Sequence, residues 1–261
     1  MSDLISRQAA IDAKDSKMIN LMQGDCLELM KNIPDGSVDM ILCDLPYGTT
    51  QNKWDSVIPL KPLWEQYRRA IKNNGAIVLF GAEPFSSALR MSNLSMWRYD
   101  WIWRKNKATQ YLNANRRPLS NYEIISVFSC RGAQYNPQMG EGKAYSNNHK
   151  PGDSGECYGS VKYSKRKNVT TRYPKTIIDF PVVMKPVHPT EKPVALLEYL
   201  IKTYTNEGET VLDNCMGSGS TGVACVNLKR NFIGMELEEE YFKIAEGRIN
   251  NARLNQQTGG D

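Results

Sequence analysis

Short apolar runs alternate with segments of helical periodicity over most of the chain. Runs of β-forming residues that stop at polar or glycine residues predict strands at 19–23, 38–43, 76–80, 100–103, 122–128, 210–213 and 231–236. Apolar positions at helical spacing predict helices at 1–17, 27–33, 62–72, 83–91, 194–204, 221–228 and 238–252. This alternation indicates an α/β fold with a doubly wound, mostly parallel sheet.

The alternation is lost between Arg104 and Lys175, apart from the strand at 122–128. Residues 98–175 hold fifteen Lys and Arg against five Asp and Glu, and eight of the thirteen tyrosines. A charge run alone more often marks a solvated face. A long basic and aromatic insert in a compact domain favours a nucleic-acid surface.

The apolar strand at 38–43 ends abruptly at Asp44-Leu45-Pro46-Tyr47-Gly48. Ligands of open α/β sheets sit beyond the carboxyl ends of the strands, so these residues are expected in a crevice. The Asp44 carboxylate and the carbonyls of Leu45 and Pro46 can accept hydrogen bonds from an amino group, and the Tyr47 ring can stack on a flat one. The group implied is an aromatic amine such as that of a nucleobase, although the motif alone could be an ordinary turn.

A second candidate site is the glycine loop that begins at Gly217 and follows the strand at 210–213. Gly217-Ser-Gly219-Ser-Thr-Gly222 fits the dinucleotide-binding pattern, with Glu236 about where a ribose-binding acid belongs. However, Asp213 stands at the end of the strand, where it would repel a pyrophosphate and favour a cofactor that carries an ammonium group. S-adenosylmethionine fits, with its ribose on Glu236 and its adenine near Asp25, although Asp25 could equally be a helix cap.

Composition bears on metal binding and on the location of the protein in the cell. The chain of 261 residues has six cysteines without metal-ligand spacing and only two histidines, so we expect no metal. It shows neither an apolar run of about 20 residues nor a signal-peptide pattern. We therefore expect a cytoplasmic protein that does not enter membranes.

Three motifs together resemble the amino-group DNA methyltransferases. They are Asp44-Leu45-Pro46-Tyr47, the His188-Pro-Thr190-Glu-Lys192-Pro193 segment, and the glycine loop after Asp213. Their order resembles the β-group of that family. Leu45 replaces the proline usual at that position, which keeps the backbone acceptor. Cys43 and Cys215 are interpreted as packing residues, because amine methylation needs no covalent nucleophile.

The resemblance implies transfer of a methyl group from S-adenosylmethionine to the exocyclic amine of adenine in double-stranded DNA, by base flipping, as in restriction-modification systems. The implied domains are a catalytic half at 18–104, an inserted target-recognition region at 105–186 and a cofactor-binding half at 187–254. The implied catalytic residues are Asp44, Leu45, Pro46 and Tyr47. The implied cofactor-binding residues are Asp25, Cys26, Asp44, His188, Thr190, Lys192, Asp213, Cys215, Gly217, Gly219, Ser220, Thr221 and Glu236. The expected DNA contacts are Lys105, Lys107, Arg116, Arg117, Lys165, Arg166 and Lys167.

By the same resemblance, Lys192 is expected to pair with the carboxylate of the cofactor. The alternatives within this class are methylation of the cytosine N4 amine and of adenine in RNA. From other classes, a dinucleotide-dependent oxidoreductase would explain only the glycine loop, and a non-catalytic DNA-binding protein only the insert. A homodimer is left open.

Overall fold

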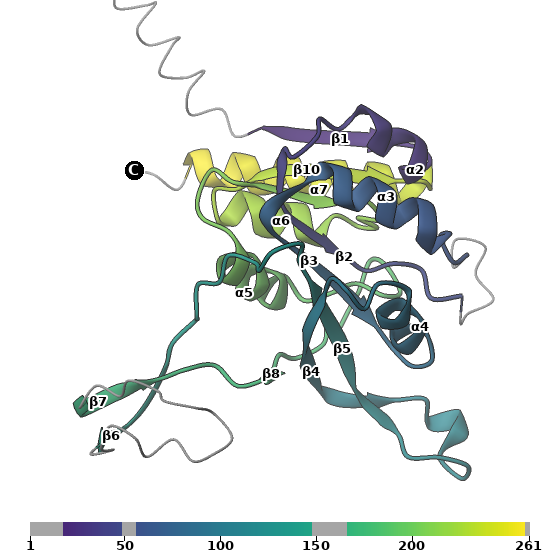
Figure 1. Ribbon diagram of the computed structural model, residues 1–261. Helices are drawn as coiled ribbons and strands as arrows, with labels where there is room; N and C mark the ends of the chain where they lie inside the picture. Colours follow the sequence, from purple (N-terminus) through teal and green to yellow (C-terminus); the bar gives the residue numbers. More distant parts are fainter. Residues whose placement is uncertain (1–17, 49–55, 148–165, 259–261) are drawn as a thin grey trace, which may run out of the picture. The chain divides into compact units, whose positions relative to one another are not determined.

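A central sheet of eight strands organises the main part of the molecule (Figure 1). The structure is a computed structural model that describes residues 18–48, 56–147 and 166–258. In spatial order the strands are β1 (Ile19–Gln23), β10 (Asn231–Glu236), β9 (Thr210–Asp213), β2 (Val38–Cys43), β3 (Ile71–Gly81), β5 (Ser120–Phe128), β4 (Trp97–Thr109) and β8 (Ile177–Asp179). Within this sheet β5 is antiparallel to both neighbours, and all other adjacent strands are parallel. The predicted doubly wound, mostly parallel sheet is confirmed.

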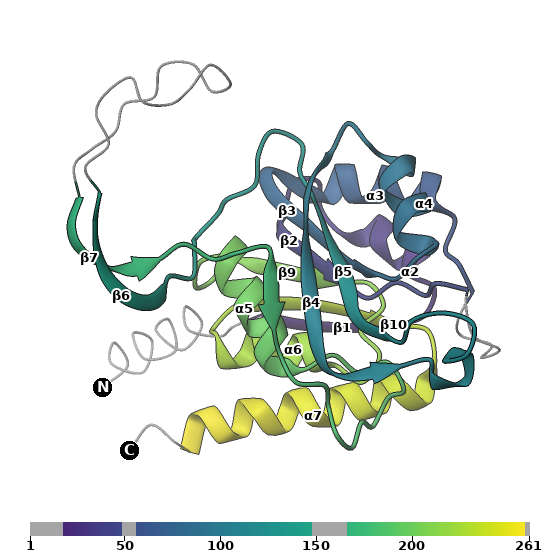
Figure 2. The same cartoon turned by 90° about the horizontal axis from the view of Figure 1, so that it is seen from below.

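Helices cover both faces of the sheet (Figure 2). One face is covered by α2 (Cys26–Leu29), the 3-10 turn η1 (Met30–Asn32), α3 (Leu60–Ala70) and α4 (Phe85–Ser92). The other is covered by α5 (Val194–Tyr204), α6 (Ser220–Asn227) and α7 (Glu239–Thr258). No helix in these described ranges is long and apolar enough to cross a membrane.

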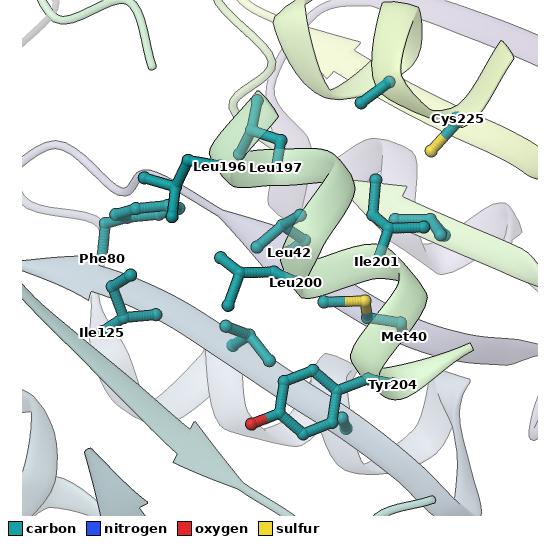
Figure 3. Packing of buried hydrophobic residues seen from close by; sticks show 14 of the residues in the cluster. Met40, Leu42, Phe80, Ile125, Leu196, Leu197, Leu200, Ile201, Tyr204 and Cys225 are labelled. Atoms are coloured by element: carbon teal, nitrogen blue, oxygen red, sulfur yellow. The ribbon is translucent and has the colours of Figure 1, made fainter. Parts of the chain in front are cut away.

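The two faces form two apolar clusters because successive side chains of a strand point to opposite sides. On β2, Met40 and Leu42 pack with α5, α6 and α7, while Ile41 and Cys43 pack with α3 and α4. Figure 3 shows Leu200 and Tyr204 of α5 within the first cluster. Burial of each such large side chain contributes about 1.5–3 kcal/mol. The strand that carries the candidate catalytic motif is therefore held from both sides.

The chain leaves β2 and β9 in opposite directions along the sheet. From β2 it continues to β3, and from β9 to β10, although β2 and β9 are hydrogen-bonded neighbours. Such a switch point opens a crevice beyond the carboxyl ends of the two strands. Asp44 follows β2 and Asp213 ends β9, so the fold brings the two candidate sites to the same crevice.

The expectation of an irregular chain from Arg104 to Lys175 is wrong in several places. β4 continues to Thr109, where it pairs with Ser120 of β5, and the 3-10 turn η2 (Tyr111–Asn113) lies between the two strands. A separate compact unit at 137–175 contains the antiparallel pair β6 (Gly140–Asn147) and β7 (Arg166–Arg172). Cross-strand hydrogen bonds and contacts such as the Arg172 guanidinium over the Tyr145 ring, 4.3 Å from its centroid, form these strands without an apolar pattern.

Some predicted boundaries also move. The helix expected at 62–72 starts at Leu60 and ends at Ala70, and the following strand begins at Ile71 rather than at Ala76. The helix expected at 27–33 divides into α2 and η1. The helix expected at 1–17 lies outside the described residues.

Candidate functional site

A cavity of about 380 Å³ lies at the carboxyl ends of β2 and β9. All four residues of the predicted catalytic motif line it. So do all the predicted cofactor residues except Gly219: Asp25, Cys26, Asp44, His188, Thr190, Lys192, Asp213, Cys215, Gly217, Ser220, Thr221 and Glu236. Segments from both ends of the sequence therefore face one space.

Asp44 is the largely buried carboxylate at the end of β2. Its Oδ1 accepts a hydrogen bond of 2.6 Å from the Tyr47 hydroxyl, and its Oδ2 accepts one from the Lys192 ammonium. Burial raises the pKa of Asp44 above its usual range, and the ammonium opposes this rise. The Tyr47 ring is stacked on Phe85, with centroids 5.0 Å apart. Asp44 and Tyr47 are thus held in fixed orientations.

Lys192 belongs to a chain of four alternating charges. Its Nζ pairs with Asp44 and lies 3.4 Å from Oε2 of Glu123, whose Oε1 pairs with Lys105. In this structure the partners of Lys192 are therefore the carboxylates of Asp44 and Glu123. Lys105, expected to contact DNA, has a side chain only 12% exposed and is engaged by Glu123.

Glu123 is a residue of the site that the sequence analysis missed. It lies on β5, opposite Trp103 of β4, and reaches the cavity edge through Lys192. The available signal was an acid within the otherwise mostly apolar run at 122–128, but nothing local identifies its partners.

Two carboxylates shape the glycine loop. Asp213 accepts hydrogen bonds from the Cys215 amide (3.1 Å) and the Thr221 hydroxyl (2.7 Å), and burial raises its pKa to about 7. Glu236 accepts hydrogen bonds from the amides of Gly217 (2.8 Å) and Glu238 (2.9 Å), and burial raises its pKa as well. Both carboxylates fix the loop and also line the cavity.

Asp25 is a helix cap, the alternative role considered from the sequence. Its Oδ1 accepts hydrogen bonds from the amides of Leu27 (2.8 Å) and Glu28 (3.2 Å) at the start of α2. Because Asp25 also lines the cavity, the cap fixes the carboxylate at its edge.

Gly219 differs from the expectation because it does not line the cavity. Its φ is +80°, and a Cβ atom there would lie 2.8 Å from Cβ of Ala245 and 2.9 Å from its Cα. Glycine at this position lets the loop approach α7, so its contribution is to packing.

The segment before α5 is fixed by contacts that the sequence analysis did not anticipate. The Thr190 amide donates to Nδ1 of His188 (3.2 Å), and the His188 ring packs edge-on against Tyr241. Burial and the nearby Lys192 lower the pKa of His188, which favours the neutral ring. Arg248 of α7 donates to Glu191 Oε1 (2.6 Å) and to the Ser218 carbonyl (2.8 Å), so it joins this segment to the glycine loop.

The other expected DNA contacts lie in two places. Lys107, Arg116 and Arg117 are exposed at the end of the β4–β5 hairpin. Arg166 and Lys167 begin β7 in the separate unit, and their side chains, like the whole of Lys165, lie outside the described part of the chain.

The charge of the cavity suits a cationic ligand better than a pyrophosphate. Of the described residues that line it, Lys192 is the only Lys or Arg, and two carboxylates already balance its charge. Asp25, Asp213 and Glu236 add further acidic groups. Nowhere in the described ranges do three or more His, Cys, Asp or Glu side chains form a group able to hold a metal ion.

Comparison with known proteins finds DNA methyltransferases among the relatives of this chain. The type II methyltransferase M2.MboI of Moraxella bovis is 28% identical over 265 residues, with 90% of this chain and 88% of that protein covered. M.HpaI of Haemophilus parainfluenzae is 25% identical, with coverage of 88% and 73%. The structure of the M1.HpyAVI–SAM complex is 28% identical, with a TM-score of 0.60 and coverage of 88% and 100%.

The cytosine-N4-specific PvuII DNA methyltransferase, at 15% identity, shares the fold with a TM-score of 0.64 over 94% of this chain and 95% of its own. A family model described as DNA methylase, for the N6 and N4 enzymes, matches residues 38–247. The chain therefore belongs to the N6/N4 DNA methylase family.

Proposed function

We propose that this protein methylates the N6 amine of adenine in double-stranded DNA, with the target base flipped into the cavity described above. The observation that carries the proposal is the common cavity of Asp44-Leu45-Pro46-Tyr47 and the glycine loop. A target amine and a methyl donor could meet there, out of the DNA stack.

The cofactor is S-adenosylmethionine, which supplies a methyl group activated on a sulfonium. The acidic lining of the cavity supports a positively charged cofactor, and its volume suits a ligand of this size. Glu236 is the acceptor proposed for the ribose hydroxyls, because each of its oxygens keeps a lone pair beside the backbone amide it already binds. Asp213 fixes the loop through its hydrogen bonds with Cys215 and Thr221.

Asp44 is proposed to accept a hydrogen bond from the target amine. That amine is a poor nucleophile because its lone pair is delocalised into the base. Hydrogen bonds to Asp44 and to the Leu45 carbonyl would draw the nitrogen towards tetrahedral geometry. Tyr47 packs one side on Phe85, and we propose that its other face receives the flipped base.

Asp at the head of the catalytic motif favours adenine over cytosine as the target. The cytosine N4 amine presents the same two N–H groups to Asp44, so it is the alternative target, and adenine in RNA is the next. Lys107, Arg116, Arg117 and the Lys165-Arg166-Lys167 cluster are the phosphate contacts that we propose for the duplex.

The test is methyl transfer from labelled S-adenosylmethionine to plasmid DNA, followed by digestion and chromatography of the nucleosides. We expect N6-methyladenine with wild type and none with Asp44→Ala. S-adenosylhomocysteine, unlike NAD, should bind both proteins in a calorimetric titration, which shows that the variant is folded. N4-methylcytosine would reassign the target, transfer to RNA alone would reassign the substrate, and binding of NAD only would overturn the proposal.

A further inference from the structure

The end of the β4–β5 hairpin lies on the same edge of the sheet as Asp44. β5 runs antiparallel to β3, and its Ile124 pairs with Gly81, the last residue of β3. Residues that precede Ile124 on β5 therefore extend beyond the carboxyl end of β3. The contact from Glu123 through Lys192 to Asp44 agrees with this position. In Figure 1 the segment that joins β4 to β5 projects away from the sheet.

This end exposes large apolar side chains. Gln110 has a φ of +66° and leads into η2, where Tyr111 is 75% exposed and Leu112 is 92% exposed. A single exposed leucine is common on protein surfaces. Here two adjacent large side chains, those of Tyr111 and Leu112, occupy a short helical turn at the tip of a hairpin that points away from the core.

Basic residues surround the apolar tip without acidic ones. Residues 105–120 contain four Lys and Arg and no Asp or Glu. Lys105 is engaged at the base of the hairpin, whereas Lys107, Arg116 and Arg117 are exposed, and no ion pair is recorded for them within the described ranges. The tip therefore combines apolar side chains with uncompensated positive charge, which suits a polyanion that also offers apolar surface, as stacked bases do.

We propose that Leu112, supported by Tyr111, is the wedge that enters the duplex at the position vacated by the flipped base. This inference rests on the proposed function, because only base flipping leaves a gap in the stack. In other DNA complexes apolar side chains insert between base steps and unstack them. Arg116 and Arg117 would bind the phosphates on either side of the wedge. The hairpin places the wedge at the same edge of the sheet as Asp44.

The experiment compares two duplexes that contain the methylated site, read beforehand by sequencing DNA from cells that express the protein. In one duplex the target base is paired, and in the other it is mismatched and already partly unstacked. Leu112→Ser should lower the single-turnover rate on the paired duplex by about tenfold or more, because the unstacked state loses its support. The mismatched duplex should restore most of that rate. Leu94→Ser, which alters a 53% exposed leucine between α4 and β4, is the matched control and should behave as wild type on both.

Other outcomes separate the wedge from the proposed function. An equal loss on both duplexes would overturn the wedge and make Leu112 an ordinary DNA contact. An unchanged rate on both duplexes would also overturn the wedge, and the apolar tip would then be assigned to contact with a protein partner. If wild type transfers no methyl group to DNA at all, the proposed function fails and the wedge fails with it.

Discussion

At the scale of single residues, the ionisation of Asp44 decides what the site can do. An ionised carboxylate accepts hydrogen bonds at both oxygens, whereas a protonated one donates from one of them. Burial raises the pKa of Asp44, and Lys192 opposes that rise through a direct ion pair. Methyl transfer should therefore decline as the pH falls through this raised pKa, at a higher pH than for an ordinary aspartate.

Lys192→Met should move this acid limb of the rate to still higher pH, because the buried carboxylate loses its cation while burial stays. The measurement is the single-turnover methylation rate against pH, at saturating DNA and cofactor. Lys31→Met, which removes a cation from an exposed pair with Glu28, is the control and should leave the profile unchanged. A lower rate with the limb at the wild-type pH would contradict the dependence on Asp44, provided that S-adenosylhomocysteine still binds.

At the scale of elements, the sequence predicts best the short apolar strands whose ends are marked by glycine or polar residues. β1, β9 and β10 have the predicted bounds, because each is a short apolar run that ends at a glycine or at charged or polar residues. The approach of the two motifs was also predictable, since the carboxyl ends of parallel strands meet at one edge. The β6–β7 pair and the extension of β4 were not predictable, because their hydrogen bonds join residues far apart along a polar chain. The roles of Glu123 and Arg248 were not predictable from the sequence for the same reason, since their partners come from other elements.

The contact between the glycine loop and α7 allows a test on two glycines. Gly219→Ala should lower the free energy of unfolding by about 2 kcal/mol or more, because alanine is strained at positive φ and its Cβ would meet Ala245. Gly247→Ala is the control on α7 itself, where a Cβ atom meets nothing within 4 Å. It should raise stability by roughly 0.5–1 kcal/mol. Urea unfolding measures both, and equal effects would contradict the packing role of Gly219.

At the scale of the whole molecule, acidic and basic side chains are concentrated in different places. The cavity is lined by carboxylates, while the end of the β4–β5 hairpin is basic. An acidic cavity suits a cationic cofactor, and a basic projection suits phosphates. These charges are expected to guide different ligands to their places.

Salt dependence tests the basic end. Replacement of Lys107, Arg116 and Arg117 by Ser should flatten the slope of log affinity against log salt by up to about 2.7, if all three contact phosphates. Affinity should fall equally for all DNA sequences, and binding of S-adenosylhomocysteine should not change. Replacement of Lys31, Lys61 and Lys202, three exposed lysines elsewhere, is the matched control. Parallel lines for the two triple variants would show that the hairpin end does not touch the phosphates.

The chain of four charges sets a limit on the exchange of the β4–β5 hairpin between relatives. Lys105 and Glu123 stand at the base of the hairpin, one on each strand, and hold Lys192 beside Asp44. A graft confined to residues 106–119 would keep Lys105 and Glu123, and the contacts of Lys192 with Asp44 and Glu123 would stay as they are. A graft that ends after Glu123 would replace one of the two carboxylates that Lys192 contacts, and one that begins before Lys105 would replace the cation that pairs with Glu123. An exchange of the hairpin tip should therefore preserve the contacts of Lys192 only when it stays between those two residues.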